Sequence, residues 1–433
     1  MTSKDSPPKT TRRQYLATVG LGALSAPSAV ESAIDTTEAR RAGLSDPRAS
    51  LTNQQLAKEL HALAEGSPHA ALRRIGRSAG RDDPIWELRV GRGETNVHLV
   101  TQLHGDEPAG TEAILALVRD VTSNPEANLD LLSRLTLTVV PRANPDGAMF
   151  ARDEDADGAD ERVTRRENVQ PWRRRDSRRE PDYHSADEPP GYDLNRDFDP
   201  TVEFSGADRS SDTRSSGEWT RYEEDGETQW RHDRQYRGAT LRGCGLGLTP
   251  ETAAVADSYR RADPDVAITH HHKSVETRGR GGEAPSLLSV MAPFGPAYLE
   301  RAPSYERDDP PETIVNPFVD AEMSRRSLRL NSFVARQLTS LGEFGTVTRY
   351  GYEPLWGSYL DALTPKTNAA GMLYEVAGQS DERDSVDYAR KVAVSRTAFR
   401  RTLEALASDP DLGTVDENRY FDLPVESSGP TSR

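Results

Sequence analysis

The chain has a single cysteine, Cys244, in 433 residues. One cysteine excludes an intramolecular disulfide framework and any cysteine-rich zinc module. No run approaches the ~18 apolar residues of a membrane-spanning helix, so we expect no integral membrane segment. Hydrophobic residues are also scarce, at 35% of the chain. Such a composition fits a disordered chain or a folded protein adapted to high salt, and regular apolar periodicity in several segments favours the folded protein.

Lysine is nearly absent from the basic residues. Only six of the 55 basic residues are lysine, which leaves 49 arginines against 70 acidic residues and a net charge of −15. A surface that binds nucleic acid is normally net basic, so this charge argues against a nucleic-acid partner. Many carboxylates and few lysines are typical of proteins that stay hydrated in strong salt, which predicts a halophile-type protein.

The N-terminal segment has the order of an export signal. Residues 11–16 read TRRQYL, and a short, mildly apolar stretch rich in glycine and alanine follows. A basic region, an apolar region and small residues in this order are typical of a signal peptide. The adjacent Arg12 and Arg13 resemble a twin-arginine signal. We therefore predict a signal peptide over residues 1–33, a linker over 34–50 and a secreted, extracellular protein.

The remaining chain predicts one long α/β domain over residues 51–408. Continuous apolar runs at 135–140 and 266–269 indicate strands buried on both faces, and amphipathic helical patterns lie between such runs. This alternation is the signature of a mostly parallel sheet. Two segments dense in Arg, Asp and Glu, residues 148–190 and 200–240, are interpreted as surface insertions, and residues 409–433 as a C-terminal tail.

A candidate metal site begins with His104 and Glu107, which lie where a predicted strand ends and a helix begins. A catalytic zinc ion takes three protein ligands, often two histidines and one glutamate, and leaves one position open. Open α/β sheets place their sites at the carboxyl ends of strands. The histidines at 270–272 follow the predicted strand 266–269, so one of them is expected to be the third ligand.

Side-chain alternation decides among these three histidines. Along a strand, Ala267, Thr269 and His271 share one face. A crowded metal site needs small neighbours beneath the ligand, which favours His271. His270 is the alternative, and His272 is interpreted as a group behind the ligands or on the substrate side.

Further polar residues suit the other parts of a hydrolytic site. Glu375 lies in the apolar strand sequence MLYEVA, where a carboxylate is rarely buried unless it is paired or functional. Asn195 and Arg196 offer amide and guanidinium donors that suit a carboxylate. The sequence DEDADG at 153–158 has the form of a calcium loop, but Thr164 stands where the bidentate glutamate should be, so we interpret it as an acidic surface loop.

In this order, HGDEPAG (104–110), NPDG (144–147), DLNRDF (193–198), the histidine strand and LYEVAG (373–378) resemble the zinc carboxypeptidase family. The resemblance implies an α/β fold with a mixed, mostly parallel sheet of eight strands and helices on both faces. It implies one Zn²⁺ per chain, held by His104, Glu107 and His271. It further implies that Glu375 is the general base and that Asn195 and Arg196 bind the C-terminal carboxylate of a substrate.

Two family residues are placed less directly. The family has an arginine near the scissile carbonyl, in a Trp-Arg segment after the NPDG turn, and Arg173 fits this description. It also has a mobile tyrosine, and counting back from the segment GSYLD at 357–361 favours Tyr352. Leu360 within that segment suggests an apolar pocket for the substrate side chain.

The resemblance predicts a secreted zinc metallocarboxypeptidase that acts on peptides with a free C-terminal carboxylate. One alternative on the same fold is a zinc-dependent deacylase of N-acyl amino acids. A second alternative is a non-catalytic surface binding protein, whose mark would be the loss of a metal ligand or of the base. The export signal and the NPDG turn favour the peptidase.

Overall fold

The structure is a computed structural model, and it describes residues 50–152, 161–173, 179–186, 188–204, 217–224, 227–273, 286–301, 314–378 and 386–426. The predicted signal peptide, nearly all of the predicted linker and the DEDADG loop lie outside the described residues. Within the described part, no helix combines the length and apolarity needed to cross a membrane.

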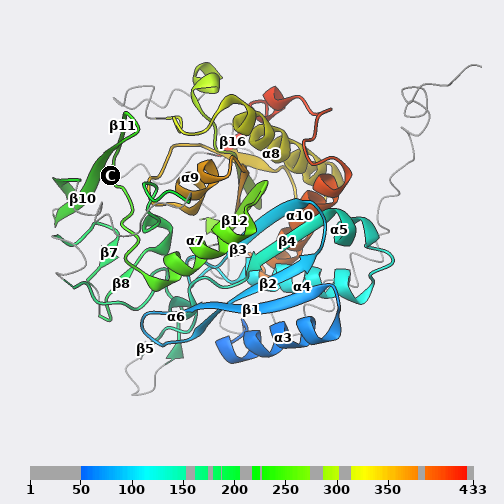
Figure 1. The fold of residues 1–433 in the computed structure, drawn as a ribbon, viewed down its shortest axis with the longest axis horizontal. Helices are drawn as coiled ribbons and strands as arrows, with labels where there is room; N and C mark the ends of the chain where they lie inside the picture. Colours follow the sequence, from blue (N-terminus) through cyan, green and yellow to red (C-terminus); the bar gives the residue numbers. More distant parts are fainter. Residues whose placement is uncertain are drawn as a thin grey trace, which may run out of the picture.

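A mixed sheet of nine strands forms the centre of the fold (Figure 1), in the order β1-β2-β4-β3-β12-β15-β13-β14-β16. Five of its eight strand pairings are parallel. The predicted α/β fold with a mixed, mostly parallel eight-stranded sheet is confirmed, and the two-residue β16 adds a ninth strand at one edge. The strands are β1 (Ala70–Arg77), β2 (Pro84–Gly91), β3 (Thr95–Thr101), β4 (Leu135–Val140), β12 (Val266–Lys273), β13 (Leu288–Met291), β14 (Thr348–Tyr350), β15 (Ala370–Ala377) and β16 (Val425–Glu426).

Helices cover both faces of the sheet, as Figure 1 shows, so the central strands β4 and β12 are buried along their whole length. The larger apolar core lies under five helices: α3 (Asn53–Gly66), α4 (Ala109–Ser123), α5 (Leu129–Arg134), α8 (Ala321–Leu341) and α10 (Tyr388–Ser408). A smaller core on the opposite face lies under α7 (Pro250–Ala262) and α9 (Tyr359–Leu363). Ala267 belongs to this smaller core, so the α7 side is also the side to which His271 points.

Close glycine contacts join the loops at the carboxyl ends of β3 and β4. A Cβ on Gly105 would lie 2.2 Å from the carbonyl carbon of Gly147, so no larger residue fits there without movement. Gly147 belongs to the short helix α6 (Pro145–Ala148), which is capped by the side chain of Asn144. The HGDE turn and the NPDG turn therefore pack directly against each other.

The second charged insertion has a fold of its own. Its described part forms a three-stranded antiparallel sheet of β9 (Glu218–Glu224), β10 (Glu227–Tyr236) and β11 (Ala239–Leu241). Figure 1 shows β10 and β11 at the side of the molecule opposite α5 and α10. The described residues of the first insertion form the short strands β5 (Ala151–Arg152), β6 (Glu161–Arg162) and β7 (His184–Ser185), and β8 (Gly191–Tyr192) follows directly after it.

The segment after α10, predicted as a tail, is packed against the domain up to Glu426, the last described residue. A short 3-10 helix, Glu417–Tyr420, buries Tyr420 completely, and the Tyr420 hydroxyl accepts a hydrogen bond from the Ala292 N–H at 3.1 Å. Beyond it, β16 pairs with β14. Leu412 and Leu423 of this segment are buried in the same apolar core as Tyr420.

Candidate active site

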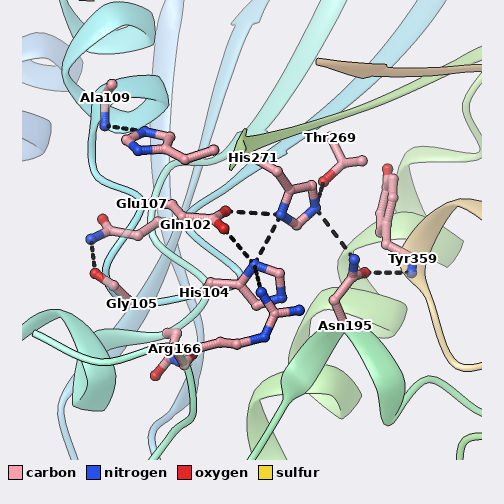
Figure 2. A network of polar contacts seen from close by, with 12 residues as sticks. Gln102, His104, Gly105, Glu107, Ala109, Arg166, Asn195, Thr269, His271 and Tyr359 are labelled. Carbon is pink, nitrogen blue, oxygen red and sulfur yellow. Dashed lines mark hydrogen bonds and ion pairs between the residues drawn. The ribbon is translucent and has the colours of Figure 1, made fainter. Parts of the chain in front are cut away.

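Three side chains converge at the carboxyl ends of β3 and β12. His104 and Glu107 follow β3, and His271 lies in β12, which pairs directly and in parallel with β3. Figure 2 shows their polar atoms facing one another. His104 Nδ1 is 2.8 Å from Glu107 Oε1, His271 Nδ1 is 2.9 Å from Glu107 Oε2, and the two Nδ1 atoms are 3.2 Å apart. All three side chains are buried.

This geometry fits a zinc ion. The three side chains offer ligand atoms that all lie within 4.8 Å of one another. Two ligands at about 2.1 Å from a tetrahedral zinc ion lie about 3.4 Å apart, close to the distances found here. The predicted zinc site of His104, Glu107 and His271 is confirmed as a ligand set.

Hydrogen bonds behind the two histidines orient their rings. Asp193 Oδ1 lies 3.2 Å from His104 Nε2, and Thr269 Oγ1 lies 3.1 Å from His271 Nε2. A ligating histidine usually donates its other ring N–H to such an oxygen, which fixes the tautomer. Both Nδ1 atoms are therefore left to face the metal.

The other two histidines of the triplet point to the opposite face of β12. His270 Nε2 lies 2.8 Å from Ser395 Oγ on α10, and His272 Nε2 accepts a hydrogen bond from Ala109 N–H at the start of α4. His272 therefore supports a helix terminus and does not lie on the substrate side. Strand alternation accounts for all three placements.

Glu375 lies beside the metal ligands. In the parallel pairing of β12 and β15, His271 is directly opposite Glu375, so both side chains leave the sheet on the same face. Glu375 Oε2 is buried and has no hydrogen-bond partner among the described residues. Burial, and then the nearby Glu107 carboxylate, raise the pKa of Glu375 well above its usual value. An unpaired carboxylate oxygen next to a three-ligand metal site suits a proton acceptor.

The arginine that faces the ligands is Arg166, not Arg173. Arg166 Nη1 lies 3.3 Å from His104 Nδ1, and Nε donates to Asp193 Oδ2 at 2.9 Å. Arg173 is exposed. Burial raises the pKa of Asp193, but the nearby Arg166 and His104 lower it further, so that it lies well below its usual range. Asp193 therefore stays ionised and accepts hydrogen bonds from both residues. The prediction of Arg173, made from the Trp-Arg sequence, was wrong, because a different arginine of the same arginine-rich segment contacts the ligands.

The predicted mobile tyrosine is held in the core. Tyr352 is 1% exposed, and its hydroxyl donates to Asp361, a buried residue of α9. Because this hydroxyl is bonded to Asp361 within the core, the structure does not support the mobile role predicted for Tyr352. Leu360 is also buried, at 1% exposure.

Asn195 lies at the ligands, and Arg196 follows it in the chain. The side-chain oxygen of Asn195, Oδ1, accepts a hydrogen bond from the Tyr359 N–H at 3.0 Å. The side-chain nitrogen Nδ2 is thereby directed toward His271 Nε2, 3.4 Å away (Figure 2). The Arg196 guanidinium donates to the Asn195 backbone carbonyl at 3.0 Å. The predicted pair is thus joined, and it lies on the same side of the sheet as His271.

Comparison with family models agrees with this site. The model described as zinc carboxypeptidase matches residues 56–277, which include all three metal ligands, Arg166 and Asn195. The chain belongs to the zinc carboxypeptidase family. Glu375 lies beyond the matched range, so its place beside the ligands is an observation of the structure alone.

Curated relatives share only short stretches with this family member. A probable carboxypeptidase 2 of Trichophyton verrucosum is 42% identical over 48 residues, which is 11% of this chain and 9% of that protein. Human carboxypeptidase D is 30% identical over 113 residues, or 24% of this chain and 8% of that protein. The matches span less than a tenth of the length of these relatives.

A solved structure supports the fold over most of the chain. The crystal structure of thrombin activatable fibrinolysis inhibitor superposes with a TM-score of 0.52 at 17% identity, covering 88% of this chain and 81% of that one. At this identity the likeness concerns the fold alone.

Replacement of single histidines tests the ligand set. We expect His271→Ala to weaken zinc binding by more than the ~100-fold seen when only a supporting residue is lost, because a direct ligand disappears. His272→Ala is the matched control, and its zinc affinity should stay within about threefold of the original protein. Chelator competition on the folded, metal-free proteins measures both values. Equal losses in the two variants, or a larger loss in His272→Ala, would contradict the assignment.

Proposed function

We propose that this protein is a zinc-dependent carboxypeptidase that hydrolyses the C-terminal peptide bond of its substrates. The observation that carries the proposal is the position of Glu375, directly opposite His271 with a buried, unpaired oxygen beside a three-ligand site. A non-catalytic binding protein has no need to keep such a costly carboxylate.

Zinc, Glu375 and Arg166 have separate roles in the proposed hydrolysis. Zinc, when bound, would act as a Lewis acid that polarises the scissile carbonyl and lowers the pKa of a water molecule. Glu375 accepts the proton of the attacking water and delivers it to the leaving amine. Arg166, beside His104, donates hydrogen bonds to the oxyanion that develops on the carbonyl oxygen.

Recognition of the substrate's end rests on Asn195 and Arg196. A guanidinium group binds a carboxylate through two parallel hydrogen bonds, and the neighbouring amide adds a further donor. The closeness of Asn195 to His271 supports this role, because a terminal carboxylate bound there would lie one residue from the bond to be cut. The proposed substrates are therefore peptides with a free C-terminal carboxylate.

The general base is tested by Glu375→Gln, which keeps the shape and removes the proton acceptor. We expect the original protein to hydrolyse a blocked dipeptide with a free carboxylate, and not its C-terminal amide. Glu375→Gln should lose at least ~100-fold in kcat, the usual contribution of a general base, while zinc affinity is retained. A variant with unchanged activity would contradict the assignment of Glu375 as the general base. Faster hydrolysis of an N-acyl amino acid than of the dipeptide would favour the deacylase.

The role of Arg166 is tested against Arg173 as a matched control. Arg166→Ala should lower kcat by about 100- to 1,000-fold, the usual effect of losing one oxyanion donor. Arg173→Ala removes the same charge from an exposed position and should stay within about twofold of the original kcat. Steady-state kinetics on the blocked dipeptide measure both. A large loss in Arg173→Ala with none in Arg166→Ala would restore the sequence-based assignment.

We also propose that the protein is secreted by the twin-arginine route, on the strength of Arg12 and Arg13 before a short apolar stretch. This route requires the arginine pair, so Arg12→Lys with Arg13→Lys should leave the uncleaved precursor inside the cell. Immunoblots of cells and medium compare the variant with the original protein. Equal amounts of both in the medium would rule this route out.

A further inference from the structure

Gln102 is an unusual residue at the base of the metal-ligand turn. It is fully buried, it directly follows β3, and its φ of +54° lies in the left-handed region that only glycine enters without cost. It stands two positions before His104. A strained residue persists only where its surroundings hold it, and such residues gather at functional sites.

The Gln102 side chain makes three hydrogen bonds that fix its orientation. Oε1 accepts from Arg142 Nε at 2.7 Å and from Thr111 Oγ1 at 2.9 Å. Nε2 donates to the Gly105 carbonyl at 2.7 Å, the contact that Figure 2 shows. An arginine can only donate, so the amide oxygen must face Arg142. The amide N–H is then directed at Gly105, which lies between the ligands His104 and Glu107.

Arg142 connects this glutamine to the start of the described chain. Arg142 is 2% exposed, and its guanidinium donates through Nη1 to Asn53 Oδ1 and through Nη2 to the Leu51 carbonyl, each at 2.8 Å. The Leu51 N–H in turn donates to the buried Glu112 carboxylate at 3.0 Å. The segment 51–53 is thereby fixed to the same buried arginine that orients Gln102.

We propose that Gln102 and Arg142 form a buried relay that positions the metal-ligand turn and makes zinc affinity depend on the docking of residues 51–53. The physical reason is preorganisation. A turn that carries two of three ligands loses freedom when zinc binds, and the hydrogen bond to Gly105 removes part of that freedom beforehand. Groups that orient ligands in this way typically change metal affinity by 10- to 100-fold. The inference rests on the zinc site and not on the proposed substrate.

Two substitutions of Gln102 separate positioning from stability. Gln102→Met keeps the size and the backbone strain but loses all three hydrogen bonds. Gln102→Gly loses them too, but relieves the strain at φ +54°. We expect both variants to bind zinc 10- to 100-fold more weakly in chelator competition, with metal-free Gln102→Gly unfolding at a higher temperature than metal-free Gln102→Met.

A double-mutant cycle tests the link to residues 51–53. Asn53→Ala removes the acceptor of Arg142 Nη1 and should weaken zinc binding by several-fold in the original background. In the Gln102→Met background the relay is already broken, so Asn53→Ala should have little further effect. Coupled residues show such non-additivity, and independent ones do not.

Thr402→Val serves as a matched control, because it removes a buried hydroxyl on α10 that bonds to Tyr374, on the face of the sheet opposite to His271. It should lower the unfolding temperature and leave zinc affinity unchanged. The proposal is overturned if Gln102→Gly binds zinc within about twofold of the original protein, or if the effects of Asn53→Ala and Gln102→Met simply add. Zinc affinity is measured directly, so a protein that hydrolyses no peptide still gives a decisive result.

Discussion

The parallel pairing of β12 with β3 on one side and β15 on the other is the constraint on which the site depends. Parallel strands end at the same edge of a sheet, so their loops and last residues meet there. This pairing alone brings together His271, Glu375 and the turn that carries His104 and Glu107. The helices bury the strands from both faces, and the rigid core then holds the ligands in place.

The α/β class and the third metal ligand could be predicted because both follow from periodic patterns. Continuous apolar runs indicated buried central strands, and alternation along β12 selected His271 among three histidines. Glu375 was predictable because an isolated carboxylate in an apolar strand requires a physical reason. In each case a short stretch of sequence contains the whole physical argument.

Arg166, Tyr352 and the C-terminal segment depend on contacts that no local pattern records. Several arginines follow the NPDG turn, and only packing shows that Arg166 reaches the ligands: its carbonyl accepts from the Gly105 N–H at 3.2 Å. Tyr352 is turned inward by Asp361, nine residues away. Tyr420 is buried against strands and helices far from it in sequence. Such long-range contacts lie beyond what periodicity can predict.

The separation of His104 from His271 also has a consequence for how the chain folds. The two ligands are 167 positions apart, and β12 must pair with β3 before they meet. Contacts between distant segments form late because closing long loops costs entropy. No short fragment of the chain can hold all three ligands, so zinc binding reports that β12 has paired with β3. Once bound, the metal penalises any opening that separates these strands.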